Sequence, residues 1–180
     1  MSRNYKFLDQ QRPYFITFSV IHWIDVFTRT LYKDILVESI KFCIENKGLE
    51  VYAWCIMSNH IHMVIGTKDL DMQEIIRDMK KHTSKEIVKA IRANEQESRK
   101  EWMLWMFERE GKRNPNNQGH QFWQQDNHPI ELFTNEVIQQ KIDYIHNNPV
   151  KAGWVDEPEH YLYSSARDYA GLPGIIPIIL

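Results

Sequence analysis

The spacing of apolar residues in the first half of the chain changes between the period of a strand and that of a helix. Residues 14–21 are β-branched and aromatic, which predicts a strand. Residues 31–46 carry apolar side chains at helical spacing. Residues 49–57 are apolar on both faces and predict a central strand, which the tight turn Ser58-Asn59 joins to a further strand over residues 60–66.

The middle of the chain is more varied. Residues 72–93 have the pattern of a long amphipathic helix with lysines on its polar face. Residues 95–121 are the least regular part, and we expect the turn-rich stretch 111–119 to be a mobile loop. Residues 122–133 are expected to return to the sheet as a strand that is interrupted near Pro129.

The last part of the chain predicts a helix over residues 135–148. Thr134 or Asn135 would open this helix, and Pro149 would stop it. The apolar tail, residues 174–180, is too short to cross a membrane. We expect it to dock on the domain or on a second subunit.

The order β-α-β-β-α-β, followed by a further helix, is the split βαβ plan of ferredoxin-like α+β domains. A length of 180 residues favours one domain, and we take it to span residues 1–180. We expect a central antiparallel sheet with the helices on one face. The other face would be open or would pair with a partner.

Composition excludes several classes of protein. The chain is 43% hydrophobic and 26% charged, as is usual for a globular protein. Its two cysteines make no disulfide framework, its N-terminus is polar, and no apolar run approaches the ~20 residues of a membrane span. We therefore expect a cytoplasmic protein with no membrane partner. The net charge of −2 gives no overall signal of nucleic-acid binding, although residues 77–113 hold 11 Lys and Arg against 7 Asp and Glu.

The segment His60-Ile61-His62 is the first candidate for chemistry. Alternate side chains of a strand share a face, so both imidazoles would lie about 6.5–7 Å apart along the strand, within reach of one metal ion. Ile61 would then point into the core. Such a pair can equally be two ordinary polar positions, and the pair alone favours that interpretation.

Tyr144 is the second candidate. It shares one face of its helix with Val137, Lys141 and Asn148, which follow a 4-3-4 spacing. Taken alone, the pattern favours a half-buried aromatic side chain whose hydroxyl is hydrogen-bonded.

Together these segments resemble a known family. Residues 52–65, which contain Ser58-Asn59-His60-Ile61-His62, resemble the metal motif of the HUH single-strand DNA transposases. Phe122-Trp123-Gln124-Gln125, then the segment 144–153, then Tyr163-Ser164-Ser165, are similar to the REP-associated tyrosine transposases within that superfamily. The resemblance runs from about residue 13 to residue 171. This chain departs from the family at Ser58, where proline is usual, and in its long segment 95–121.

The resemblance implies that single-stranded DNA is cleaved and rejoined. Tyr144 matches the nucleophile, which becomes linked to the 5′ end of the DNA through a phosphotyrosine. His60, His62 and Asn148 match the ligands of a Mg²⁺ or Mn²⁺ ion. Two neutral imidazoles and an amide oxygen would give an open site with room for phosphate and water.

The partner that the resemblance implies is single-stranded DNA with hairpin (palindromic) elements. Phosphate contacts are expected from lysine and arginine, and the candidates are Arg77, Lys80, Lys81, Lys85 and Lys151. A solvated helix face is the usual fate of such residues. The sequence leaves open whether the protein is a monomer or a homodimer, and whether Tyr144 completes the site of its own chain or of a partner.

Two other classes of function remain open at this stage. The chain could be a DNA-binding regulator that has lost cleavage, or a metal-dependent hydrolase with water as its nucleophile. A covalent protein–DNA adduct would separate both from a transposase.

Overall fold

The computed structural model describes residues 7, 9–68, 71–114, 119–125 and 129–180. Its four strands are β1 (Tyr14–Ser19), β2 (Leu49–Ile56), β3 (His60–Thr67) and β4 (Ile130–Glu131). They form one sheet in the order β2-β3-β1-β4, in which every paired neighbour is antiparallel. The predicted α+β class and the central antiparallel sheet are confirmed.

The three predicted helices appear in the expected order as α1 (Thr30–Lys47), α2 (Met72–Ala93) and α4 (Asn135–His146). Three further helices are added to them among the described residues, namely α3 (Lys100–Arg113), α5 (Asn148–Lys151) and α6 (Ala166–Tyr169), with 3-10 turns at Ile21–Trp23, Val26–Thr28 and Pro158–His160. The start of α4 is as expected, because the Thr134 side chain accepts a hydrogen bond from the backbone N–H of Val137. The Asp71 side chain caps α2 in the same way.

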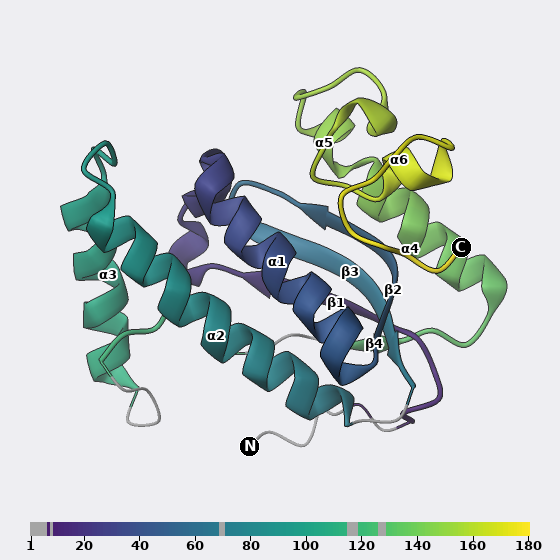
Figure 1. The fold of residues 1–180 in the computed structure, drawn as a ribbon, viewed down its shortest axis with the longest axis horizontal. Coiled ribbons are helices and arrows are strands. Elements are labelled where there is room, and N and C mark those ends of the chain that lie inside the picture. Colours follow the sequence, from purple (N-terminus) through teal and green to yellow (C-terminus); the bar gives the residue numbers. More distant parts are fainter. Residues whose placement is uncertain (1–6, 8, 69–70, 115–118, 126–128) are drawn as a thin grey trace.

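The larger core lies between the sheet and the helices α1 and α2. The sheet contributes side chains that point to one face, and they pack against the apolar stripes of the two helices. Its members include Ile16, Phe18, Ile61, Met63, Leu36, Ile40, Ile75 and Met79. Figure 1 shows α1 and α2 crossing this face, with α3 beyond α2.

A second core covers the opposite face of the sheet, and it corrects the expectation that all helices lie on one side. Ile142 and Ile145 of α4 pack there with Phe15, Cys55 and Val64 of the sheet. The reason is visible in the strands themselves. Residues 49–57 are apolar on both faces, and a strand of that kind needs cover on both sides. In Figure 1, α4 lies away from α1 and α2.

The segment 95–121 is more regular than predicted, because α3 occupies most of it. Gly111, expected in a loop, lies in the last turn of α3, and the chain returns directly over it at His120. The rest of the predicted loop includes residues 115–118, which lie outside the described residues.

The predicted strand 122–133 is shorter in the structure than expected. The strand β4 holds two residues, and Trp123 forms only an isolated bridge to Val20. Residues 126–128 of that prediction are outside the described part of the chain.

Pro149 lies inside a short helix, although the sequence predicted that it would end one. The helix α4 ends at His146, and α5 begins at Asn148 with Pro149 in its first turn. A proline is tolerated there because the first N–H groups of a helix have no intrahelical acceptor.

The apolar tail docks on the domain, which was one of the two expected outcomes. Ile176 is buried in the larger core, and the backbone N–H of Ile179 donates to the carbonyl of Val51. In the described part of the chain, no helix has both the length and the hydropathy needed to span a membrane.

A first prediction concerns Gly111. Alanine in place of a glycine inside a helix usually stabilises a protein by about 0.5–1 kcal/mol. Here the added Cβ would lie 2.5 Å from the Cα of His120, so Gly111→Ala should instead destabilise the fold by roughly 1–3 kcal/mol. Chemical unfolding would measure this difference. Lys112→Ala, at the exposed neighbouring position, should be nearly neutral, and a gain of stability in Gly111→Ala would contradict the close approach.

Candidate active site

His60 and His62 lie on β3, one of the two inner strands of the sheet, with their side chains on the α4 face. In the antiparallel pairing with β1, His60 is opposite Ser19 and His62 is opposite Thr17. The centroids of the two imidazole rings are 4.6 Å apart, with the planes at 72°. Ile61, between them, is buried in the larger core on the other face.

Tyr144 of the same chain lies directly beside this pair. The centroid of its ring is 5.2 Å from that of His62 and 5.9 Å from that of Phe15, both in edge-to-face geometry. The side chain is 41% exposed, because Tyr144 is at the rim of the face that α4 buries. The hydroxyl-bearing ring is therefore open to solvent and adjacent to the histidines, without a contribution from a second subunit.

Hydrogen bonds orient both imidazoles. Nδ1 of His60 donates to Oδ1 of Asn59 at 2.7 Å, since that amide oxygen can only accept. Nδ1 of His62 lies 2.8 Å from Oγ1 of Thr17. For His60 this assigns the proton to Nδ1 and leaves the lone pair on Nε2. For both rings the Nε2 atoms are the ones left to bind a metal, in the arrangement that supporting hydrogen bonds usually give to metal-binding histidines.

Burial keeps both rings neutral. It lowers the pKa of His60 from its ordinary value of 6.5 to about 4, against a weaker opposing effect of the Asp25 carboxylate. It lowers the pKa of His62 to about 3, and the nearby charges of His60 and Lys141 add to the effect. His62 is only 6% exposed and His60 is partly buried, so His62 in particular is far less open than a solvent-facing strand position would be.

Asn148 lies one helical turn after Tyr144, as expected from the sequence. Its Nδ2 donates to the Tyr144 carbonyl at 2.6 Å, which leaves Oδ1 as the atom that could bind a cation. Two neutral imidazole nitrogens and one amide oxygen are donors of the kind that an open divalent-cation site uses. Among the described residues, no group of three or more His, Cys, Asp or Glu side chains could hold a metal ion. The site therefore has none of the closed ligand sets that characterise structural zinc.

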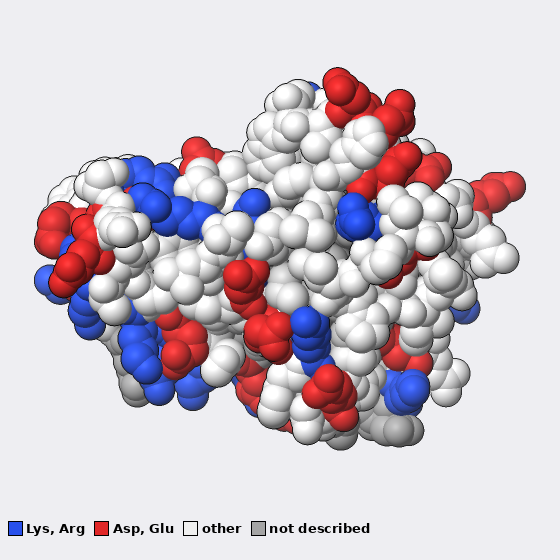
Figure 2. All heavy atoms as spheres, turned by 45° about the horizontal axis from the view of Figure 1, so that its top comes forward, with Lys and Arg blue, Asp and Glu red and all other residues white. Residues whose placement is uncertain are grey.

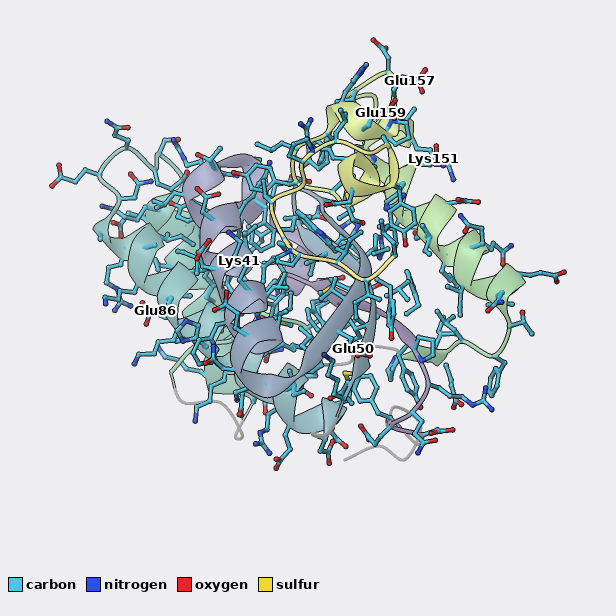
Figure 3. All side chains as sticks on the ribbon, turned by 45° about the vertical axis from the view of Figure 1, so that its right-hand side comes forward. Lys41, Glu50, Glu86, Lys151, Glu157 and Glu159 are labelled. Atoms are coloured by element: carbon cyan, nitrogen blue, oxygen red, sulfur yellow. The ribbon has the colours of Figure 1, made fainter. Side chains whose placement is uncertain are left out.

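Two lysines lie over the Tyr144 ring. Nζ of Lys151, a residue predicted to contact DNA, is 5.7 Å from the ring centroid, and Nζ of Lys141 is 5.9 Å from it. Figure 3 shows Lys151 beside the C-terminal end of α4. Lys141 was not among the expected DNA-binding residues, although its position one turn before Tyr144 on the same helix face was a signal for it. Both positive charges would attract a phosphate bound beside the ring.

The other four predicted basic residues lie elsewhere. Arg77, Lys80, Lys81 and Lys85 are on α2, the helix that covers the opposite face of the sheet. Arg77 pairs with carboxylates of α2 itself, and Nζ of Lys80 donates to the carbonyl of Gln124. Figure 2 shows basic and acidic side chains interleaved at the α2–α3 end of the molecule. A role for these residues in binding DNA stays a prediction.

A buried polar contact positions α4, and it gives a role to the segment Tyr163-Ser164-Ser165. Nε2 of His146 lies 2.8 Å from Oγ of Ser165, and the same hydroxyl accepts a hydrogen bond from the backbone N–H of Trp54 in β2. Burial lowers the pKa of His146 to about 4, so this ring is neutral as well. The contact ties the end of α4 to the sheet two residues after Tyr144.

Part of the chain matches a known protein family. Residues 11–107 match the family model described as "Transposase IS200 like". No curated protein matches the chain significantly.

Among solved structures, the chain is similar to a REP-associated tyrosine transposase bound to a REP hairpin. The TM-score is 0.66 at 21% identity, and the match covers 100% of this chain and 93% of the other. A second match is a transposase-like crystal structure from Deinococcus radiodurans R1, with a TM-score of 0.45, 17% identity, and 82% and 95% of the two chains covered. The first of these likenesses shows that the two proteins share a fold.

A second prediction concerns the acid stability of the fold. Unfolded histidines take up protons near their ordinary pKa of 6.5, whereas folded His60 and His62 do so only near 4 and 3. The unfolded state therefore binds more protons over this range, and the free energy of unfolding should fall as the pH decreases from about 6.5 towards 4 and level off above about 7.

The double variant His60→Gln/His62→Gln removes both groups. Its free energy of unfolding should decrease less between about pH 7.5 and about pH 5 than that of the wild type. Urea unfolding at the two pH values would measure the difference. The buried His146 leaves part of the pH dependence in place. An unchanged dependence in the double variant would show that the two rings are not held neutral.

Proposed function

Because the chain belongs to the IS200-like transposase family, we propose that it cleaves and rejoins single-stranded DNA through a covalent bond between Tyr144 and a DNA 5′-phosphate. The observation that carries the proposal is the position of Tyr144. Its exposed ring lies 5.2 Å from that of His62, on the sheet face where both imidazoles are held neutral. This arrangement supports a nucleophilic hydroxyl that acts beside a phosphate-binding centre of the same chain.

In the proposed reaction, the Tyr144 oxygen forms a bond to the phosphorus of the scissile phosphate. The bond from phosphorus to the 3′-oxygen of the preceding nucleotide breaks, and this oxygen leaves as a 3′-hydroxyl after taking up a proton. The tyrosine proton is released to solvent. Rejoining is the reverse step, in which a 3′-hydroxyl attacks the phosphotyrosine. Lys141 and Lys151, both over the ring, favour the negative charge that develops there.

We propose that Nε2 of His60, Nε2 of His62 and Oδ1 of Asn148 hold a Mg²⁺ or Mn²⁺ ion. When bound, such an ion supplies stabilisation of negative charge on the phosphate oxygens. The hydrogen bonds of His60 with Asn59 and of His62 with Thr17 would hold the two rings in place for this role. The hydrogen bond from Asn148 to the Tyr144 carbonyl couples the third ligand to the helix that carries the nucleophile.

We propose hairpin DNA with single-stranded flanks as the substrate class. The support is the shared fold with a REP-associated tyrosine transposase whose structure holds a REP hairpin. Lys151 would contact phosphate near Tyr144. The four basic residues of α2 (Arg77, Lys80, Lys81 and Lys85) would contact the DNA further from the reacting centre, as phosphate contacts position nucleic acid without reading its sequence.

A third prediction tests the nucleophile. Tyr144→Phe removes one oxygen and keeps the ring contacts with His62 and Phe15, so the melting temperature should change little. Cleavage of single-stranded hairpin DNA should decrease by roughly a thousandfold or more, because the group that attacks phosphorus is gone. The wild type should form an adduct that survives denaturation and maps by mass spectrometry to Tyr144.

Tyr169→Phe is a matched control. Tyr169 is 38% exposed, close to the 41% of Tyr144, but its hydroxyl donates to the backbone of Tyr52. Adduct formation should persist in this variant. Cleavage without an adduct, retained in Tyr144→Phe, would instead indicate a hydrolase. DNA binding with neither cleavage nor adduct would indicate a regulator.

A fourth prediction tests the metal. Removal of divalent cations with EDTA should abolish adduct formation by the wild type, and Mg²⁺ or Mn²⁺ should restore it. His62→Gln should lose this cation-dependent activity while DNA binding is kept, since glutamine fills most of the buried volume of the ring. Adduct formation that continues in EDTA would overturn the assignment of His60, His62 and Asn148 as metal ligands.

A further inference from the structure

Trp23 is an exposed tryptophan that contacts the candidate site through His60. Its side chain is 55% exposed, and its ring centroid is 5.7 Å from that of His60 in edge-to-face geometry. His60 in turn contacts His62, and His62 contacts Tyr144. The four rings form a row in which the two imidazoles separate the tryptophan from the tyrosine.

The backbone that carries Trp23 is strained. His22 and Trp23 have φ values of 53° and 56°, and they are the two non-glycine residues with positive φ among those that the structure describes. A bulky residue rarely adopts this left-handed conformation, and two in succession are costly. Strain of this kind persists only where surrounding contacts impose it, and it is concentrated at functional sites.

The contacts that hold Trp23 in this conformation are made by residues of the candidate site. Nδ2 of Asn59 donates to the Trp23 carbonyl at 3.2 Å and to Oδ1 of Asp25 at 3.0 Å, while Oδ1 of the same amide accepts from His60. Nη1 of Arg99 also holds the segment, because it donates to the Asp25 carbonyl at 2.9 Å. One amide side chain thus fixes both a candidate metal ligand and an exposed aromatic ring.

We propose that Trp23 is a stacking platform for one DNA base, that of the nucleotide whose 3′-oxygen leaves. This inference rests on the proposed function for its orientation. In phosphoryl transfer the attacking and leaving oxygens lie roughly in line at phosphorus. Tyr144 attacks from one end of the row of rings, so the 3′-oxygen departs towards the other end, where Trp23 lies. Bases stack on exposed aromatic rings with little dependence on sequence.

The platform would keep the cleaved 3′ end at the site. After cleavage, the 5′ side is held covalently on Tyr144, whereas the 3′-hydroxyl strand has lost its covalent link. Stacking on Trp23 retains that strand beside the phosphotyrosine, in position for the reverse reaction. Loss of the ring would therefore weaken DNA binding and favour release of the 3′ end.

The experiment measures binding of hairpin DNAs in which one base at a time is removed from the single-stranded flank. Two proteins are compared, Tyr144→Phe, which should not cleave the DNA, and Tyr144→Phe/Trp23→Ala. With Trp23 present, one abasic position should weaken binding by roughly 5- to 150-fold, the equivalent of the ~1–3 kcal/mol of one stacked base. In Trp23→Ala, binding should already be weaker by this factor, and the same abasic position should cost nothing more. Trp23→Phe should recover part of the affinity.

Trp105→Ala is the matched control, because Trp105 is equally exposed at 55% but packs with Arg109 on α3. It should show the wild-type abasic profile. A merely structural role for Trp23 is tested with Trp23→Gly, since glycine accepts a positive φ without strain. Its melting temperature should equal or exceed that of the wild type, while DNA binding decreases.

The stacking role of Trp23 would be overturned if Trp23→Ala bound DNA as tightly as the protein with Trp23 does. It would also be overturned if removal of the same base still weakened DNA binding by Trp23→Ala to the full extent. If the base whose removal has no further effect in Trp23→Ala lay on the 3′ side of the cleaved phosphate, the proposed orientation of the DNA strand would be overturned. If the wild type formed no adduct, the proposed function would fail, yet coupling between Trp23 and one base would still support the stacking. The two failures are therefore distinguishable.

Discussion

Ile142 and Ile145 of α4 pack against the β2 and β3 side chains on the second face of the sheet, and the position of Tyr144 beside the histidines follows from this contact. Burying each such side chain is worth about 1.5–3 kcal/mol, and together they set the rotation of the helix about its axis. Tyr144, between them in sequence, is brought to the rim beside His62. The bond from His146 to Ser165 fixes the end of the same helix. A rotation of α4 by a single residue would turn the hydroxyl away from the imidazoles.

Elements defined by local periodicity were predictable from the sequence. The expected bounds of α2 agree with the structure. The helix α1 is one residue longer at each end than expected, and β2 and β3 differ from expectation by one residue at their last position alone. What could not be derived is packing between segments far apart in sequence. The close approach of His120 to Gly111 is one case, because no local pattern shows that a glycine makes room for another part of the chain. The position of α4 is another, although the apolar run of β2 already required cover on both faces.

The same distinction between local pattern and long-range packing applies to the candidate site. Strand alternation places His60 and His62 on one face, and helical spacing places Asn148 a turn after Tyr144. The low pKa values of the histidines depend on burial by α4 and by Phe15, which is a tertiary effect. Trp23 had no sequence signal, since tryptophan gives no indication of a positive φ. Its conformation depends on Asn59, a residue 36 positions away.

The C-terminal part of the chain has a consequence for how copies of this protein can associate. Along the outer side of β2, backbone or hydroxyl groups of Tyr163, Ser165, Tyr169 and Ile179 hydrogen-bond to main-chain groups of Ile56, Trp54, Tyr52 and Val51. These bonds satisfy groups that an unprotected edge strand would offer to a neighbouring molecule. At the opposite margin, β4 presents only two residues. A second copy that extended the sheet through β2 would first have to displace this C-terminal cover, which protects the protein against edge-to-edge aggregation.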